Sequence, residues 1–160
     1  MKRFLSSLLV LGLVFLPACR RKNYRNDLSA QDLAQLGANA VAIEDPVFEG
    51  ADALPSISES IDSESDVVVC HSADGSRLDE ICIFHTDNNN AATVSTFLKN
   101  YLSELFENNR AYYDSYIPAE TPKLRDAEVR IYGSYVVYAI LDENARSLFF
   151  ETVKAKLTES

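Results

Sequence analysis

Apolar side chains recur at helical spacing in three segments of the chain, and the clearest of these segments covers residues 91–113. Its apolar positions lie three, four or seven residues apart and are Val94, Phe97, Leu98, Tyr101, Leu102, Leu105, Tyr112 and Tyr116. Such spacing puts the positions on one face of a helix. The segment is therefore predicted to be the core helix, ended by Pro118 and Pro122, which would bound a loop.

Two shorter helices are predicted near the two ends of the same region. Ser29 and Asp32 have the spacing of a capping box for a helix that reaches about residue 42. The buried side of that helix is expected to hold Leu33, Leu36, Ala40 and Ile43. Asp142 is expected to cap a last helix. Its buried face would consist of Ala145, Leu148, Phe149, Thr152 and Val153.

Four segments between these helices have the pattern of strands. Residues 67–71 and 81–85 are rich in β-branched and apolar side chains and are separated by turn residues, which favours an antiparallel hairpin. Residues 128–132 alternate between polar and apolar, and residues 135–141 form a nearly continuous apolar run, typical of an interior strand. Gly133-Ser134 fits a two-residue hairpin turn with glycine first.

The resulting order of elements is α-β-β-α-β-β-α, which predicts an α+β fold. Its sheet is expected to be small, mainly antiparallel and four-stranded, built from two hairpins and packed with about three helices. The elements span residues 29–158, a length that suits one domain with one core.

The N-terminal segment has the features of a secretory signal. Lys2 and Arg3 precede an apolar run at residues 4–16, which is shorter than the roughly 20 residues that a membrane-spanning helix needs. The following Leu16-Pro17-Ala18-Cys19 resembles a bacterial lipobox, in which the cysteine receives a diacylglycerol, although proline stands where a small residue is usual. An ordinary secretory signal and an uncleaved anchor are the alternatives.

These features predict a lipid-anchored protein. Residues 1–18 would be the lipoprotein signal peptide, Cys19 the lipidated residue and residues 19–28 a tether. Two acyl chains hold a protein stably on a membrane, whereas one holds it only marginally. The expected location is the cell membrane, with the domain facing outside the cytoplasm.

Charge excludes one class of partner. The whole chain has a net charge of −9, but the part after residue 25 has nine basic and 24 acidic residues, a net charge of −15. Such a surface repels phosphate backbones, so nucleic-acid binding is not expected. The five glycines are also too scattered to form a phosphate-binding loop.

Residues 44–66 are expected to form an acidic surface loop. The stretch holds eight acidic residues, no basic residue, and the breakers Pro46, Gly50 and Pro55. It therefore has little apolar surface to bury. A calcium site is the functional alternative, but the spacing of an EF-hand loop is absent.

Cysteine and histidine occur together in the first pair of strands, which raises the question of a zinc site. If Cys70 lies opposite Cys82, both thiols share one face of the hairpin and His71 and His85 share the other. No four-ligand metal site then closes, and neither a metal nor a cofactor is expected. Opposed cysteines could form a disulfide, because the turn is centred near Ser76, midway between them. The alternative is two small apolar residues left reduced.

Part of the sequence resembles a known family of bacterial lipoproteins, the domain-of-unknown-function family 4358. The resemblance covers roughly residues 30–157 and the lipobox. It rests on Asp79-Glu80-Ile81-Cys82-Ile83-Phe84, on Tyr116-Ile117-Pro118, and on Val129-Arg130-Ile131-Tyr132-Gly133-Ser134-Tyr135-Val136. These motifs are structural, so the resemblance implies a location and a fold but no mechanism. Cysteines at positions 70 and 82 are not typical of the family.

The expected function is that of a membrane-tethered extracytoplasmic lipoprotein, a non-catalytic module that binds an envelope protein or a glycan. No Gly-x-Ser-x-Gly motif is present, and the chain is not expected to be an enzyme. The alternative is a cell-envelope hydrolase, such as a peptidase or amidase. Seven of the eight tyrosines lie between residues 101 and 138; a glycan-stacking platform and simple coverage of the sheet are the two interpretations.

Overall fold

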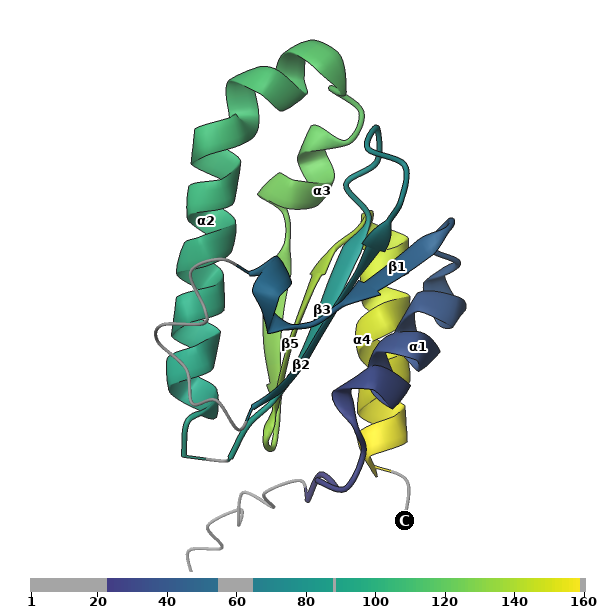
Figure 1. Ribbon diagram of the computed structural model, residues 1–160, viewed down its shortest axis with the longest axis vertical. Helices are drawn as coiled ribbons and strands as arrows, with labels where there is room; N and C mark the ends of the chain where they lie inside the picture. Colours follow the sequence, from purple (N-terminus) through teal and green to yellow (C-terminus); the bar gives the residue numbers. More distant parts are fainter. Residues whose placement is uncertain (1–22, 55–64, 88, 159–160) are drawn as a thin grey trace, which may run out of the picture.

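The computed structural model describes residues 23–54, 65–87 and 89–158, which form an antiparallel sheet with helices on both faces (Figure 1). The strands are β1 (Pro46–Glu49), β2 (Asp66–Ser72), β3 (Glu80–His85), β4 (Glu128–Tyr132) and β5 (Tyr135–Ile140). The helices are α1 (Ala30–Val41), α2 (Ala91–Tyr116), α3 (Thr121–Arg125) and α4 (Glu143–Thr158), with a short 3-10 turn, η1 (Ala51–Ala53). The expected signal peptide, residues 1–18, and Cys19 lie outside the described residues.

The sheet order is β1-β2-β3-β5-β4, and the two expected hairpins, β2–β3 and β4–β5, are present. The strand β5 lies inside the sheet, as its apolar run predicts, and all six of its residues are buried. Gly133 has a φ of +62°, and Tyr132 pairs with Tyr135, so Gly133-Ser134 is a two-residue hairpin turn that favours glycine first.

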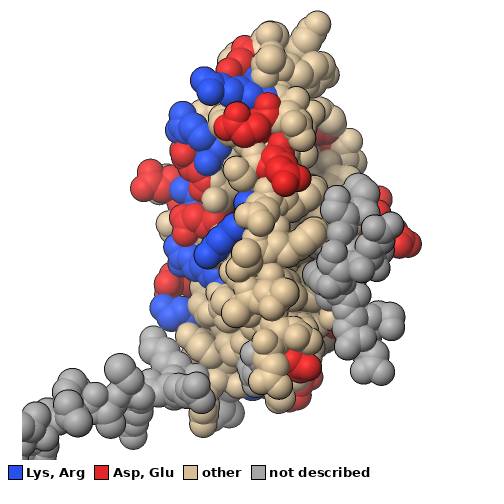
Figure 2. All heavy atoms as spheres, turned by 90° about the vertical axis from the view of Figure 1, so that its left-hand side faces the viewer, with Lys and Arg blue, Asp and Glu red and all other residues tan. Residues whose placement is uncertain are grey.

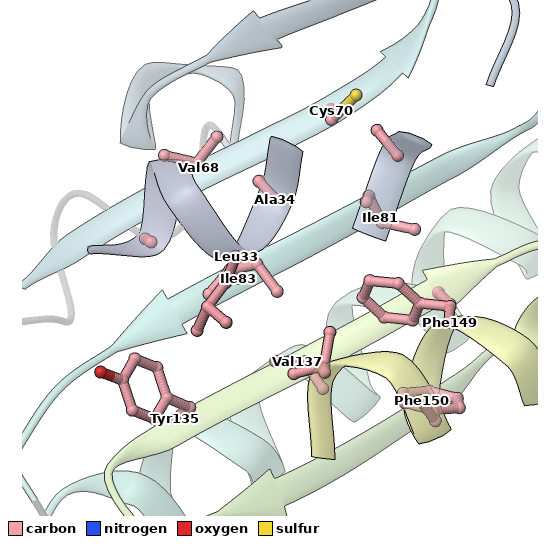
Figure 3. Packing of buried hydrophobic residues seen from close by; sticks show 14 of the residues in the cluster. Leu33, Ala34, Val68, Cys70, Ile81, Ile83, Tyr135, Val137, Phe149 and Phe150 are labelled. Atoms are coloured by element: carbon pink, nitrogen blue, oxygen red, sulfur yellow. The ribbon is translucent and has the colours of Figure 1, made fainter. Parts of the chain in front are cut away.

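Successive residues of the interior strands face opposite helical layers, because side chains alternate across a strand. Residues 81, 83, 135, 137 and 139 face α1 and α4, and residues 82, 84, 136, 138 and 140 face α2. Figure 3 shows the first of these layers, in which Leu33 and Ala34 of α1 and Phe149 and Phe150 of α4 lie over the strands. The α+β class is therefore confirmed, as one helix–sheet–helix sandwich.

The core helix is present but longer than expected, and its far end leaves the core. Val94, Leu98 and Leu102 are buried against the sheet. Tyr112 and Tyr116 were expected on the same buried face, yet their exposed fractions are 58% and 72%. The reason is length: α2 extends past the end of the sheet (Figure 1), so the apolar stripe continues where no strand lies beneath it.

The sheet has five strands, so the expected count of four was wrong. The additional strand, β1, lies in residues 44–66, the stretch predicted to be a loop, and pairs with β2 from Pro46↔Ser72 to Glu49↔Val69. An edge strand is bonded on one side only and tolerates proline at its first residue, so four residues among acids suffice. Farther along the same stretch Leu54 is buried at 1% exposure. Residues 55–64 lie outside the described residues.

A second element was also missed. The helix α3 begins at Thr121 and includes Pro122, which was expected to bound a loop. Proline in the first turn of a helix loses no hydrogen bond, because the N–H groups there have no intrahelical partner. The other helices bury somewhat different faces than expected: α4 buries Phe150 and leaves Leu148 half exposed, and α1 buries Gly37 and Ala38 rather than Leu36 and Ala40. The helices α1 and α4 also pack against each other, so the buried side of each helix differs from the side predicted for contact with the sheet alone.

The described part of the expected tether, residues 23–28, is attached to the domain. The Arg25 N–H donates to the carbonyl of Leu157 at 3.0 Å, and the Tyr135 hydroxyl donates to the carbonyl of Leu28 at 2.7 Å. The Tyr24 ring lies 5.5 Å from that of Tyr132. These contacts extend the domain to residue 23, ahead of the expected boundary at residue 29.

Candidate functional site

A cleft of about 340 Å³ opens between α2, from Tyr101 onward, and the end of the sheet where β2 turns into β3. The helix side contributes Tyr101, Leu105 and Tyr113, and α3 contributes Leu124. The strands and their turn contribute His71, Ser72, Ala73, Gly75, Arg77, Leu78, Asp79, Glu80 and Ile140. Because α2 extends past the sheet, Tyr101 and Tyr113 form one wall of the cleft and the ends of the strands form the other.

Glu80, the first residue of β3, lies in this cleft on the α2 side of the sheet. Its Oε1 accepts a hydrogen bond of 2.5 Å from the Tyr138 hydroxyl. Burial raises the pKa of the Glu80 carboxyl, and the Tyr138 hydrogen bond and the charge of His71 oppose that rise. None of the ion pairs among the described residues includes Glu80.

The tyrosines around Glu80 are held in the neutral form. Burial, reinforced by the charge of Glu80, raises the pKa of Tyr101 to about 12 and raises that of Tyr113 above its usual value. The same two causes raise the pKa of Tyr138 well above its usual range. At neutral pH all three phenols therefore keep their protons and can serve as hydrogen-bond donors.

A network of ion pairs closes one end of the cleft. The Asp79 side chain, only 7% exposed, contacts Arg77 Nη2 at 2.6 Å and Lys123 Nζ at 2.6 Å. Lys123 also contacts Glu120 Oε2 at 2.7 Å, and that same oxygen accepts from the Leu78 N–H at 2.9 Å. The network thus ties α3 to the β2–β3 turn and fixes the shape of the opening.

His71 lies at the rim, with both ring nitrogens engaged. Its Nδ1 is 2.9 Å from the Ser72 carbonyl oxygen, and its Nε2 is 3.4 Å from Glu49 Oε2 of β1. The hydroxyl of Ser72 accepts from the Asp74 N–H instead. The two side chains therefore do not form the hydrogen bond that a serine nucleophile and its base require.

The predicted pairing of Cys70 with Cys82 was wrong. Cys70 is opposite Ile81, and Cys82 is opposite Val69, so the register differs by one residue from the expected one. In this register every even-numbered residue of β2 is opposite an odd-numbered residue of β3, so Cys70 and Cys82 cannot be partners. The thiols consequently face opposite layers, both buried and both free. Cys70 faces α1 and α4 (Figure 3).

The same register separates the two histidines, which were expected on one face. His71 lies on the α2 side, whereas the ring of His85 stacks on that of Tyr135 at 4.2 Å, on the other side of the sheet. Among the described residues no group of three or more metal-ligating side chains is assembled.

The tyrosines divide between the two interpretations. Tyr132, Tyr135 and Tyr138 are buried in the sheet, and Tyr101 and Tyr113 line the cleft. Tyr112 and Tyr116 project from the end of α2 with their rings 4.7 Å apart. Figure 2 views the molecule from the α2 side and shows basic and acidic side chains interspersed along one margin, with mostly uncharged atoms over the middle.

Sequence reasoning did not single out Glu80 or Tyr138 as site residues. The available signal was a carboxylate at the start of an otherwise apolar strand, Glu80-Ile81-Cys82-Ile83-Phe84, and the two tyrosine hydroxyls within the apolar run of β5. Neither position is unusual alone, because only the pairing of β3 with β5 brings the two side chains together.

A family model described as "Domain of unknown function (DUF4358)" matches residues 61–141, just over half of the chain. The chain belongs to this family. The match is shorter than the expected 30–157: it includes β2, β3, α2, α3, β4 and β5, and stops before α4. No curated protein and no solved structure matches the chain.

The matched region of the DUF4358 domain contains every residue that lines the cleft. It leaves out α1 and α4, which cover the opposite face of the sheet. Within the described residues, no helix combines the length and the apolar character needed to cross a membrane.

Proposed function

We propose that the protein is a lipid-anchored lipoprotein of the cell membrane, facing outside the cytoplasm, that binds a partner through the cleft between α2 and the sheet. The observation that carries the location is the sequence around Cys19, where a short apolar run ends in Leu16-Pro17-Ala18-Cys19. The observation that carries the binding role is the cleft, which has a volume within the range of small-molecule sites.

The position of the cleft agrees with such an anchor. The described chain begins at Asn23, at the end of the molecule that also holds the end of α4, whereas α3 and the β2–β3 turn, which contribute lining residues to the cleft, lie at the opposite end (Figure 1). Four residue steps separate Cys19 from Asn23, a reach of at most about 14 Å. An anchored domain would therefore sit close to the membrane surface, with its cleft directed away from the lipid.

The contacts in the cleft support binding over hydrolysis. The ring nitrogens of His71 are engaged by Glu49 and the Ser72 carbonyl, and the acids at the rim are paired with Arg77 and Lys123. A hydrolase needs a nucleophile or activated water near a free base. The partner of the anchored domain is an envelope protein, a glycan or a smaller solute, and the protein itself is non-catalytic.

The anchor is tested by fractionating cells that express the parent protein or Cys19→Ser. Loss of membrane association, or accumulation of an unprocessed precursor, is the expected result for the variant. Unchanged processing and membrane association would refute the anchor.

The cleft is tested by photo-crosslinking in the native envelope. A photoreactive residue at Tyr113, in the cleft, is expected to capture a partner. The same residue at Leu148, which is 50% exposed on α4 at the other face, is the control. Equal labelling from both positions would reject the cleft as the binding surface.

A further inference from the structure

Glu80 lies in the cleft, and none of the ion pairs among the described residues includes its carboxyl group. Its one hydrogen-bond partner among the described side chains is the hydroxyl of Tyr138. Desolvation raises the pKa of this carboxyl group, which means that its ionised form is less stable in the cleft than in water. A buried carboxylate is stabilised when an opposite charge enters the same desolvated space.

The lysine and arginine side chains at the cleft already form ion pairs with acidic residues of the protein. Arg77 contacts Asp79 and Glu44, and Lys123 contacts Asp79 and Glu120. With Glu49 at the His71 side chain, the acids around the cleft outnumber the lysines and arginines. The surroundings are therefore unfavourable for an anion and favourable for a cation.

The α2 wall adds aromatic surface to this charge. Tyr101 and Tyr113 both line the cleft, and the rings of Tyr112 and Tyr113 make a T-shaped contact with their centroids 5.7 Å apart. Aromatic faces attract ammonium and guanidinium groups, most strongly where water is excluded. Neutral phenols also offer hydroxyl oxygens that can accept a hydrogen bond from such a group.

We infer that the cleft binds an organic cation, a primary ammonium or guanidinium group, which pairs with Glu80 against the rings of Tyr101 and Tyr113. The inference rests on the proposed binding role of the cleft and adds the chemistry of its ligand. The charged group can belong to a free amine or to a lysine or arginine side chain, since about 340 Å³ admits either.

The first experiment is calorimetric titration of the full chain in detergent. The probes are spermidine and L-argininamide as free cations, a tetralysine peptide as a source of side-chain cations, and acetate as an anion. Binding of at least one cation and none of the acetate is expected. Tighter binding of tetralysine than of the free cations would identify a side chain as the ligand, and the reverse would identify a free amine.

Two substitutions define the site. Glu80→Gln removes the charge but keeps an oxygen for the Tyr138 hydroxyl, and is expected to weaken cation binding at least tenfold. Glu104→Gln removes a charge from the exposed side of α2 and should change the affinity for the cation less than twofold. Equal weakening by both variants would show general charge attraction and overturn the inference.

The proton and the cation compete for the same carboxyl, so affinity is expected to fall as pH is lowered through the pKa of Glu80. The groups on the same side of the sheet around it are Tyr138 of β5, Tyr101 and Tyr113 of α2, His71 of β2, Cys82 of β3 and Glu49 of β1, whereas the Cys70 thiol lies on the opposite side. Glu80→Gln should therefore reduce this pH dependence, because the variant has no carboxyl group for the proton and the cation to share.

Amide chemical-shift changes in the parent protein provide a readout that does not depend on any variant folding. Spermidine should shift Leu78, Tyr101 and Ile140 in the cleft and leave α4 unchanged. Shifts confined to other surfaces, or no binding by any cation, would refute the inference. Capture of a partner at Tyr113 in the envelope would still uphold the proposed binding role, so the two failures are distinguishable.

Discussion

Gly37 of α1 lies against the ring of Phe149 of α4, so closely that a Cβ added at Gly37 would be 2.6 Å from Phe149 Cε2. Phe149 is fully buried, and Ile81 Cδ1 would lie 3.3 Å from the same added atom. The absence of a side chain at position 37 therefore sets how closely the two helices pack over β3.

Gly37→Ala is expected to destabilise the domain by about 1–2 kcal/mol. Overpacking a core costs roughly 1–3 kcal/mol, and the better helix propensity of alanine recovers only part of that. Urea denaturation measures the change in the free energy of unfolding. Gly50→Ala is the control, because nothing lies within 4 Å of its added Cβ and its φ of −86° suits alanine. Similar stability of both variants would contradict the close packing.

Tyr135→Phe is expected to cost about 1–2 kcal/mol of stability. The Tyr135 hydroxyl donates to the carbonyl of Leu28 and accepts from the Leu28 N–H at 3.1 Å, so its removal leaves two backbone groups without their partner. Tyr112→Phe removes a hydroxyl from an exposed ring and should stay within about 0.5 kcal/mol of the parent. If Tyr135→Phe left the free energy of unfolding unchanged, residues 23–28 would not be firmly attached to the domain.

Both thiols are expected to remain free when the protein is purified under oxidising conditions. In the Cys19→Ser background, a thiol reagent should label Cys70 and Cys82 after denaturation without any reductant. Labelling of the native protein should be slow, since burial raises the pKa of Cys70 to about 11 and that of Cys82 well above its usual value. A mass lower by two hydrogens, with no labelling, would indicate a disulfide and a different register.

Stability should depend on pH through Glu80. Because its pKa is raised in the folded state, the unfolded chain releases this proton at lower pH than the folded chain does. The stabilisation from the protonated carboxyl is complete below the unfolded pKa and is lost as pH rises through the folded pKa. The free energy of unfolding of Glu80→Gln, relative to the parent, should therefore increase between pH 4 and pH 8. Urea denaturation across that range, with Glu104→Gln as the control, tests it; a constant difference would argue against a buried carboxyl.

The sequence by itself determined the elements with strong local patterns. The β-branched and apolar residues of β2 and β3, the apolar run of β5 and the Gly133-Ser134 turn each depend on neighbours a few residues away, so they were predictable together with the α+β class. The core helix was predictable for the same reason, as were the caps at Ser29 and Asp142, whose side chains accept from N–H groups of the first turn.

The tertiary structure decided what depends on residues far apart in the chain. A turn longer by one residue would have placed Cys70 opposite Cys82, and no local pattern distinguishes the two registers. The strand β1 exists because the edge of β2 is free to bond it, and its own four residues carry little signal. Glu80 and Tyr138 come into contact only because β3 pairs with β5. The cleft beside them exists because α2 extends past the end of the sheet. Local periodicity determines which faces are apolar, whereas strand pairing and relative length determine which side chains those faces bring together.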